Sequence, residues 1–165
     1  MTIAELNCLD RQAFVEAVGW VFEHSPWVAE RAWSFRPFAD AQALHAAMTD
    51  EVRRASEAEQ LALLRAHPDL GTRARLTRAS GNEQAGAGLD SLSRAEFDLL
   101  QELNADYRNR FGFPFLLAVK GSSKYDILRA LHARMEVSPQ QEFREALNQV
   151  YRIAAFRIAD TVTEG

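Results

Sequence analysis

One histidine of the sequence combines acid–base chemistry with a rigid local setting. His67 opens the stretch His67-Pro68-Asp69-Leu70-Gly71, directly after a predicted helix. Pro68 disfavours the helical conformation at His67 and fixes the direction of the chain there. An imidazole with a pKa of about 6.5 can accept or donate a proton at neutral pH. His67 is therefore a candidate general acid or base; the alternative is a histidine that caps carbonyls at the end of the helix.

A glycine-rich segment, residues 80–90, offers polar groups to a small ligand. Three of its residues are glycines, which let the backbone approach a ligand closely or adopt a positive φ. Glu83 and Gln84 of this segment provide a carboxylate acceptor and an amide. The spacing is not that of a phosphate-binding loop. A surface loop without a ligand is the alternative.

A third candidate region follows the predicted end of a helix at Gly112. The chain turns at Pro114 and continues as an apolar stretch through Phe115, Leu116, Leu117 and Ala118. The backbone N–H groups of an extended piece could bind the carbonyls of a heterocyclic ligand. The alternative is a buried, aromatic-rich connection.

An arginine interrupts the apolar stripe of the last predicted helix. At 100° per residue, Arg157 falls between Val150, Ile153 and Ala154 rather than on the polar face. A buried guanidinium needs a partner, and its planar fork suits a carboxylate or a ureido group. The alternative is an arginine that reaches solvent from the edge of the stripe.

The composition excludes several classes of function. The four histidines and single cysteine have no metal-ligand spacing, so no metal site is expected. A lone Cys8 excludes an internal disulfide and suits a reducing compartment. The net charge of −4 argues against general affinity for nucleic acid or anionic membranes. No signal peptide or apolar membrane span is expected, and a cytoplasmic protein is predicted.

The elements that position these residues are predicted to be helices. Apolar residues recur at helical spacing after Asp10, which we expect to cap the first clear helix. Ser25 with Pro26 predicts the start of a second helix, and Asp40 predicts the cap of a third. Capping boxes or similar starts are predicted at further positions: Ser56 with Glu59, Ser93 with Glu96, and Ser138 with Gln141.

The predicted fold class is all-α. We expect a single-domain helical bundle of about seven to nine helices spanning residues 1–165, because no linker or repeat divides the chain. Three segments have no clear helical pattern: His67–Thr72, Ser80–Ser91 and Gly112–Ser123. The stretch Phe115–Val119 alone suggests a short strand pattern. Functional groups tend to lie on such segments when a rigid frame holds them.

Taken in order, these segments resemble the OHCU decarboxylases, that is, the 2-oxo-4-hydroxy-4-carboxy-5-ureidoimidazoline decarboxylases. The resemblance spans about Phe14 to Ile158. It is carried by five motifs and the closing helix: Ser25-Pro26-Trp27-Val28-Ala29-Glu30, His67-Pro68-Asp69-Leu70-Gly71, Ser80-Gly81-Asn82-Glu83-Gln84, Ala87-Gly88-Leu89, Arg110-Phe111-Gly112-Phe113-Pro114-Phe115, and Arg152-Ile153-Ala154-Ala155-Phe156-Arg157-Ile158.

The resemblance implies a small all-helical homodimer, in the stand-alone prokaryotic form, that completes the conversion of urate to (S)-allantoin. It implies a carboxy-lyase that uses neither metal nor organic cofactor. The implied catalytic residues are His67, Glu83 and Arg157. The implied substrate-binding residues are Pro68, Gln84, Phe115, Leu116, Leu117 and Ala118.

Two other functions compete with this interpretation. A non-enzymatic helical interaction module would use the apolar stripes as a groove for a partner, with His67 and Arg157 as structural residues. A metal-assisted hydrolase of a ureido compound would need metal ligands that the sequence does not space correctly.

Overall fold

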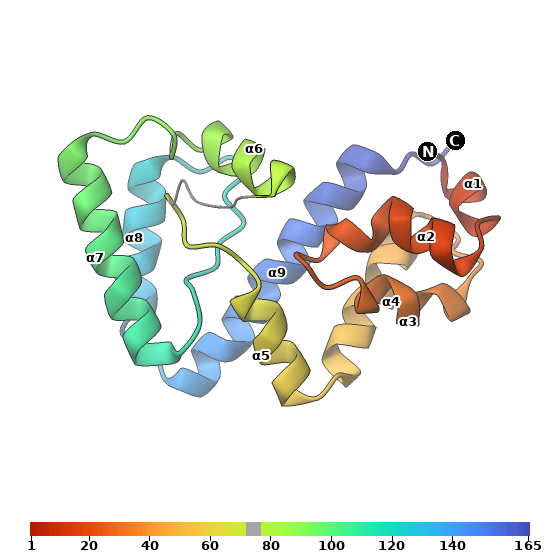
Figure 1. Ribbon diagram of the computed structural model, residues 1–165, viewed down its shortest axis with the longest axis horizontal. Helices are drawn as coiled ribbons and strands as arrows, with labels where there is room; N and C mark the ends of the chain where they lie inside the picture. Colours follow the sequence, from red (N-terminus) through yellow and green to blue (C-terminus); the bar gives the residue numbers. More distant parts are fainter. Residues whose placement is uncertain (72–76) are drawn as a thin grey trace. The chain divides into compact units, whose positions relative to one another are not determined.

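The structure is a computed structural model that describes residues 1–71 and 77–165 (Figure 1). In these two ranges the regular elements are nine α-helices and two short 3-10 helices, and strand-like pairing is limited to one bridge between Thr2 and Thr163. The predicted all-α class is therefore confirmed, with a helix number inside the predicted range. The Phe115–Val119 stretch forms no strand.

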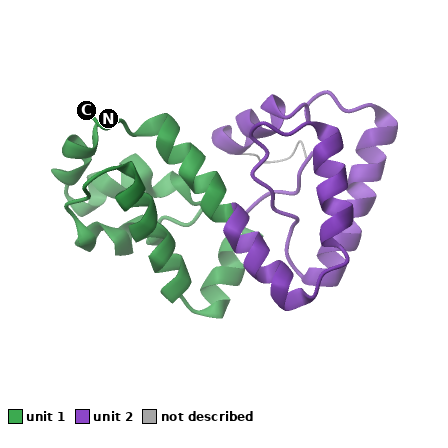
Figure 2. Cartoon of the chain, turned by 180° about the vertical axis from the view of Figure 1, so that it is seen from behind, with its two compact units in different colours: residues 1–66, 150–165 green, residues 67–149 purple. Residues whose placement is uncertain are grey.

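The chain groups into two compact units, drawn in different colours in Figure 2. Unit 1 combines Met1–Ala66 with Val150–Gly165, and unit 2 comprises His67–Gln149. The long helix α9, Pro139–Thr161, contributes its first part to unit 2 and its second part to unit 1.

Unit 1 consists mainly of short helices with local caps. Its elements in chain order are α1 (Ile3–Asn7), α2 (Arg11–Val18), η1 (Gly19–Val21), α3 (Trp27–Ala32), η2 (Trp33–Phe35), α4 (Ala41–Arg54) and α5 (Glu57–Arg65). The side chains of Asp10 and Asp40 accept the backbone N–H groups of Ala13 and Ala43, as their positions predict. Apolar side chains from these helices and from the second part of α9 form the core: Phe14, Val18, Phe22, Val28, Leu44, Met48, Val52, Val150, Ala154 and Ile158.

Within the described residues of unit 2, three helices lie wholly inside the unit, and a long irregular segment follows the second of them. The helices are α6 (Arg78–Gly86), α7 (Arg94–Phe111) and α8 (Lys124–Arg134). α7 ends at Gly112, whose left-handed conformation (φ 81°) stops the helix where the sequence predicts its end. The first part of the irregular segment after it is buried. Its buried residues are Phe113, Pro114, Phe115, Leu116, Ala118 and Val119.

Two local predictions are wrong. Ser25 does not cap α3: its hydroxyl donates to the carbonyl of Glu23, and α3 begins at Trp27 without a side-chain cap. Part of the Ser80–Ser91 segment is helical, because α6 extends to Gly86. The Thr77 hydroxyl accepts the Ser80 N–H and caps this helix in spite of its glycines. Thr72, the end of the His67–Thr72 segment, lies outside the described residues.

Candidate functional site

The His67 segment begins where α5 stops. α5 ends at Arg65, and the N–H of the cap residue Ala66 still bonds to the carbonyl of Ala62. His67 then lies outside the helix, as predicted, with only 7% of its surface exposed. A largely buried imidazole on a constrained turn is held in a defined direction, which acid–base chemistry requires.

Two side chains of α7 hold the turn that contains His67. The side-chain amide of Asn104 donates to the carbonyl of Leu70 over 2.9 Å in a buried contact. The guanidinium of Arg108 lies 2.7 Å from the carboxylate of Asp69. The turn is therefore fastened to a long helix of the same unit rather than left as a surface loop.

Gly71 ends the turn in a conformation that few other residues adopt. Its φ is +80°, and a Cβ at this position would lie 2.5 Å from Leu100 Cδ2. The N–H of Gly71 donates to the side-chain oxygen of Gln84 over 2.9 Å. The sequence therefore needs glycine here for both the backbone angle and the close approach to α7.

The helix α6 brings Gln84 to the His67 segment, although the two are well separated in the sequence. Gln84 is buried, and its amide oxygen accepts the Gly71 N–H. The NH2 end of the same amide points away from the Gly71 nitrogen and is a hydrogen-bond donor. Glu83, the preceding residue, is half-buried on the same helix. The His67 segment and the glycine-rich segment are therefore in direct contact within unit 2.

The third candidate segment is held by polar side chains on both sides. The Ala118 N–H donates to Gln149 Oε1 over 2.9 Å, so this group already has a protein partner. The guanidinium of Arg134 donates to the Leu116 carbonyl and lies over the Phe115 ring, 4.4 Å from its centroid. Leu117 is half-buried between these anchored residues.

A buried polar network contacts this segment through Arg134. Glu142, which is fully buried, accepts hydrogen bonds from the Tyr107 hydroxyl and from Arg134 Nε, the latter over 2.8 Å. Burial raises the pKa of the Tyr107 hydroxyl, and the nearby Glu142 carboxylate raises it further. The Tyr107 hydroxyl therefore acts as a neutral hydrogen-bond donor to Glu142.

Arg157 belongs to unit 1 and is buried, with 4% of its surface exposed. This confirms that it lies in the stripe of α9 and excludes an arginine that reaches solvent from the edge. Its Nη2 donates to Glu23 Oε2 over 2.9 Å, and its Nη1 lies 3.3 Å from the carbonyl oxygen of Val21. The guanidinium thus has the carboxylate partner that its burial requires.

The sequence missed the residues that hold these groups in place. Asn104 could have been found, because it is a polar residue within the apolar stripe of Leu100, Leu103 and Tyr107. Glu23 and Gln149 carry no comparable signal, since their partners are distant in the sequence.

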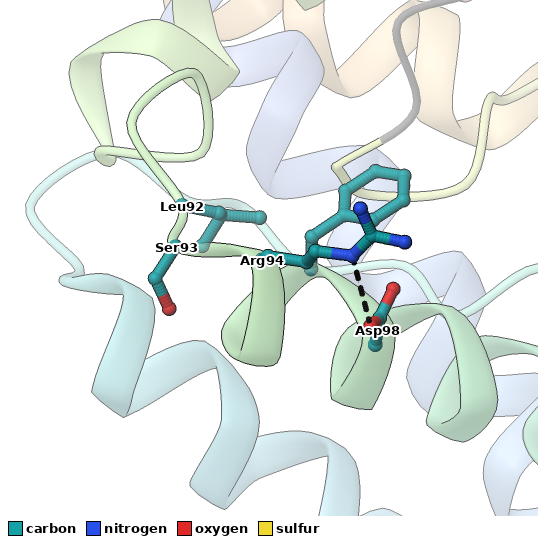
Figure 3. Close-up of a pocket in the computed structure, with 5 residues that line it drawn as sticks. Leu92, Ser93, Arg94 and Asp98 are labelled. Atoms are coloured by element: carbon teal, nitrogen blue, oxygen red, sulfur yellow. Dashed lines mark ion pairs between the residues drawn. The ribbon is translucent and has the colours of Figure 1, made fainter.

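An open hollow of about 400 Å³ lies at the start of α7 (Figure 3). Leu92, Ser93, Arg94, Phe97 and Asp98 line it, and Figure 3 shows Arg94 and Asp98 facing each other across one helical turn. None of the predicted site residues belongs to this lining. The hollow therefore provides no support for the predicted site.

The described residues contain no group of three or more histidine, cysteine, aspartate or glutamate side chains arranged to hold a metal ion. Within the same residues, no helix has the length and apolar character needed to cross a membrane.

Comparisons with known proteins agree with each other. The family described as OHCU decarboxylase matches residues 7–159. A 2-oxo-4-hydroxy-4-carboxy-5-ureidoimidazoline decarboxylase of Haloferax volcanii is 51% identical over 160 residues, which cover 97% of this chain and 95% of that protein. One of the same name from Halalkalicoccus jeotgali is 49% identical over 160 residues, 97% of this chain and 91% of that protein.

A solved structure is also similar over nearly the whole chain. The crystal structure of an (S)-allantoin synthase superposes with a TM-score of 0.78 at 33% sequence identity. The match covers 98% of this chain and 54% of that longer chain, so this chain spans about half its length.

Proposed function

Because the chain belongs to the OHCU decarboxylase family, we propose that it removes CO2 from 2-oxo-4-hydroxy-4-carboxy-5-ureidoimidazoline and forms (S)-allantoin. This reaction is the last step in the oxidation of urate to allantoin. The observation that carries the proposal is the full-length similarity to the Haloferax volcanii protein of that name. The match to residues 7–159 also supports one family domain over residues 1–165. An interaction module without enzymatic activity gains no support from any of these relatives.

The chemistry of the substrate explains why no cofactor is expected. Loss of CO2 leaves an electron pair on the ring carbon, and an adjacent C=N bond of the ring can accept it. The substrate therefore has its own electron sink, which pyridoxal phosphate or thiamine diphosphate provides in other decarboxylases. The protein has to orient the C–C bond of the leaving carboxylate and deliver a proton to one face.

In this proposal His67 transfers the proton. Its place on the turn after α5, largely buried, supports a general acid or base with a fixed direction. A positioned group of this kind contributes about 10²–10⁴-fold to a rate. Pro68 keeps the imidazole at the start of the turn and contributes to the wall beside the substrate.

The remaining predicted residues orient the substrate. Glu83 and Gln84 bind the ureido and ring N–H or carbonyl groups, and Arg157 anchors an electron-rich group. Gln84 is suited to this role because its bond to Gly71 fixes which end of its amide carries the donors. The backbone of Phe115–Ala118 lines the pocket, with Arg134 and Gln149 holding it in place.

We also propose that the protein is a cytoplasmic homodimer whose partner is the small-molecule substrate rather than nucleic acid or a membrane. The net charge of −4 supports the exclusion of nucleic acid and anionic membranes. A lone cysteine supports a reducing compartment.

The proposed activity can be tested with an intermediate made in place from urate by the two upstream enzymes. Circular dichroism then follows the formation of optically active allantoin with and without this protein. We expect a clear acceleration and an (S)-enantiomeric product, unchanged by a chelator. Racemic allantoin at the spontaneous rate would overturn the proposal.

A further inference from the structure

The guanidinium of Arg157 is held on several sides by one short segment of unit 1. Glu23 Oε2 accepts from Nη2 over 2.9 Å, and the side chains of Arg157 and Glu23 are 4% and 1% exposed. Nη1 lies 3.4 Å from the carbonyl oxygen of Trp20 and 3.3 Å from that of Val21. The Trp20 ring lies on the same group, 6.0 Å from its central carbon. Trp20, Val21 and Glu23 therefore surround part of the guanidinium.

The segment that carries Glu23 has an unfavourable backbone. It follows the 3-10 helix η1 and contains His24, which has a φ of 45° although it is not a glycine. Residues with a Cβ pay a steric cost in this left-handed region. The hydroxyl of the buried Ser25 donates to the Glu23 carbonyl over 2.8 Å and stabilises the turn. The left-handed residue thus directly follows the buried Glu23 in the same turn.

Stability alone does not account for this arrangement. A buried ion pair loses about as much in desolvation as it gains from attraction, so an apolar pair of similar volume often stabilises a core equally well. Strained residues that persist in proteins are concentrated at functional sites. A strained turn that delivers a buried carboxylate to one arginine therefore indicates that the position of this guanidinium matters for the reaction.

We propose that Glu23 is a positioning residue, which holds the Arg157 guanidinium in the orientation that binds the substrate. This inference rests on the role proposed above for Arg157. The guanidinium is a planar fork, so a bond at one of its nitrogens fixes the direction in which its other N–H groups point. A displacement of about 1 Å in a substrate-orienting group can cost about 10²-fold in rate.

The test is a double-mutant cycle measured by kcat/KM. Glu23→Asp keeps the charge but withdraws the carboxylate by one methylene, and Arg157→Lys keeps the charge but removes the fork. Glu59→Gln is the matched control. It removes the exposed partner of Arg31 in the same unit, where the side chains are 42% and 37% exposed. Circular dichroism melting shows that each variant is folded at the assay temperature.

We expect Glu23→Asp to lower kcat/KM by about 10- to 100-fold and Glu59→Gln to leave it unchanged. In the Arg157→Lys background, Glu23→Asp should have less than about a threefold further effect, because residues that act through one another are not additive. A residue that only stabilises the fold would instead lower the melting temperature and leave kcat/KM of the folded enzyme unchanged.

The results separate this inference from the proposal on which it rests. If Arg157→Lys is impaired while Glu23→Asp matches Glu59→Gln, Glu23 has no positioning role. Multiplicative losses in the double variant would also overturn it. Normal turnover in Arg157→Lys would overturn the role of Arg157 itself and this inference with it. Glu23→Gln, which keeps the shape and removes the charge, should also lose kcat/KM; if it does not fold, Glu23→Asp still decides.

Discussion

Two buried arginine–glutamate pairs, one in each unit, show that the same chemistry can support different tasks. In unit 2, Glu142 lies 2.5 Å from Arg134 and also accepts the Tyr107 hydroxyl, while Arg134 donates to the Leu116 carbonyl. In unit 1, Glu23 lies 2.9 Å from Arg157, whose guanidinium also lies near the carbonyl oxygens of Trp20 and Val21 and the Trp20 ring.

The difference lies in what each pair connects. The Arg134–Glu142 pair connects side chains of α7, α8 and α9 to the irregular segment after α7, so its loss should weaken the packing of unit 2. The Glu23–Arg157 pair connects one strained turn to the arginine that we place in substrate binding. We therefore expect changes in the first pair to appear in stability alone, and changes in the second to appear in turnover as well as in stability.

The largest stability effect is expected for Glu142→Ala. The change leaves the Arg134 charge and the Tyr107 hydroxyl buried without their shared acceptor, since Glu142 is fully buried. Breaking a buried pair in this way costs about 3–5 kcal/mol of unfolding free energy. Urea denaturation measures it, with Glu136→Ala, an exposed glutamate after α8, as the control. A loss below about 1 kcal/mol would show that the network is dispensable.

Tyr107→Phe removes one bond of the network and keeps its aromatic packing. The Tyr107 ring contacts Phe111, Phe113 and Phe115, and a phenylalanine can make the same contacts. Loss of a hydrogen bond to a charged group costs about 1.5–3 kcal/mol. The same urea titration should show this smaller loss. Wild-type stability in this variant would mean that Arg134 alone satisfies Glu142.

The stability contributed by the partly exposed Lys124–Glu96 ion pair of unit 2 should depend on pH. Lys124 and the backbone N–H of Ser93 lower the pKa of Glu96 from 4.5 to about 2. A carboxyl with a lowered pKa stabilises the fold above its unfolded pKa, and this contribution disappears as the pH falls from about 4.5 to about 2. Glu96→Gln should therefore be less stable than the wild type at pH 7, and the difference should vanish near pH 2. A constant difference across this range would contradict the assignment.

Glu59→Gln should lower the unfolding free energy least of these variants. The Arg31–Glu59 pair is exposed to solvent, where ion pairs contribute about 0–1 kcal/mol and salt screens them. Glutamine can also replace the glutamate in the capping box with Ser56. Melting curves at low and high salt measure the loss. A destabilisation comparable to that of Glu142→Ala would remove the distinction between buried and exposed pairs.

Local features of the fold could be predicted from the sequence because their determinants are a few residues apart. The caps at Asp10, Asp40, Ser56 and Ser93 depend on side chains that bond three residues ahead, and all four are present. The helix α6 was missed because its glycines and polar residues disfavour a helix locally. Its start at Thr77 and its buried Gln84 favour the helix in the folded protein.

The supports of the candidate site could not be predicted in the same way. His67, Glu83, Gln84 and Arg157 stand out by residue type and motif, but the bond from Gly71 to Gln84 spans 13 positions. Glu23 lies 134 positions from Arg157 and looks in the sequence like any surface glutamate. Only the fold shows that it is buried beside the guanidinium. Sequence patterns therefore single out candidate reacting groups more readily than the distant residues that contact them.

The central claim is that His67 transfers the proton in the decarboxylation. It is tested most directly by comparing His67→Asn with His132→Asn, an exposed histidine of α8, in single-turnover assays of the intermediate. Melting in the presence of (S)-allantoin shows whether each variant still binds the product. We expect His67→Asn to lose at least about 100-fold in rate and still bind the product, while His132→Asn behaves as the wild type. A near-wild-type rate in His67→Asn would contradict this claim.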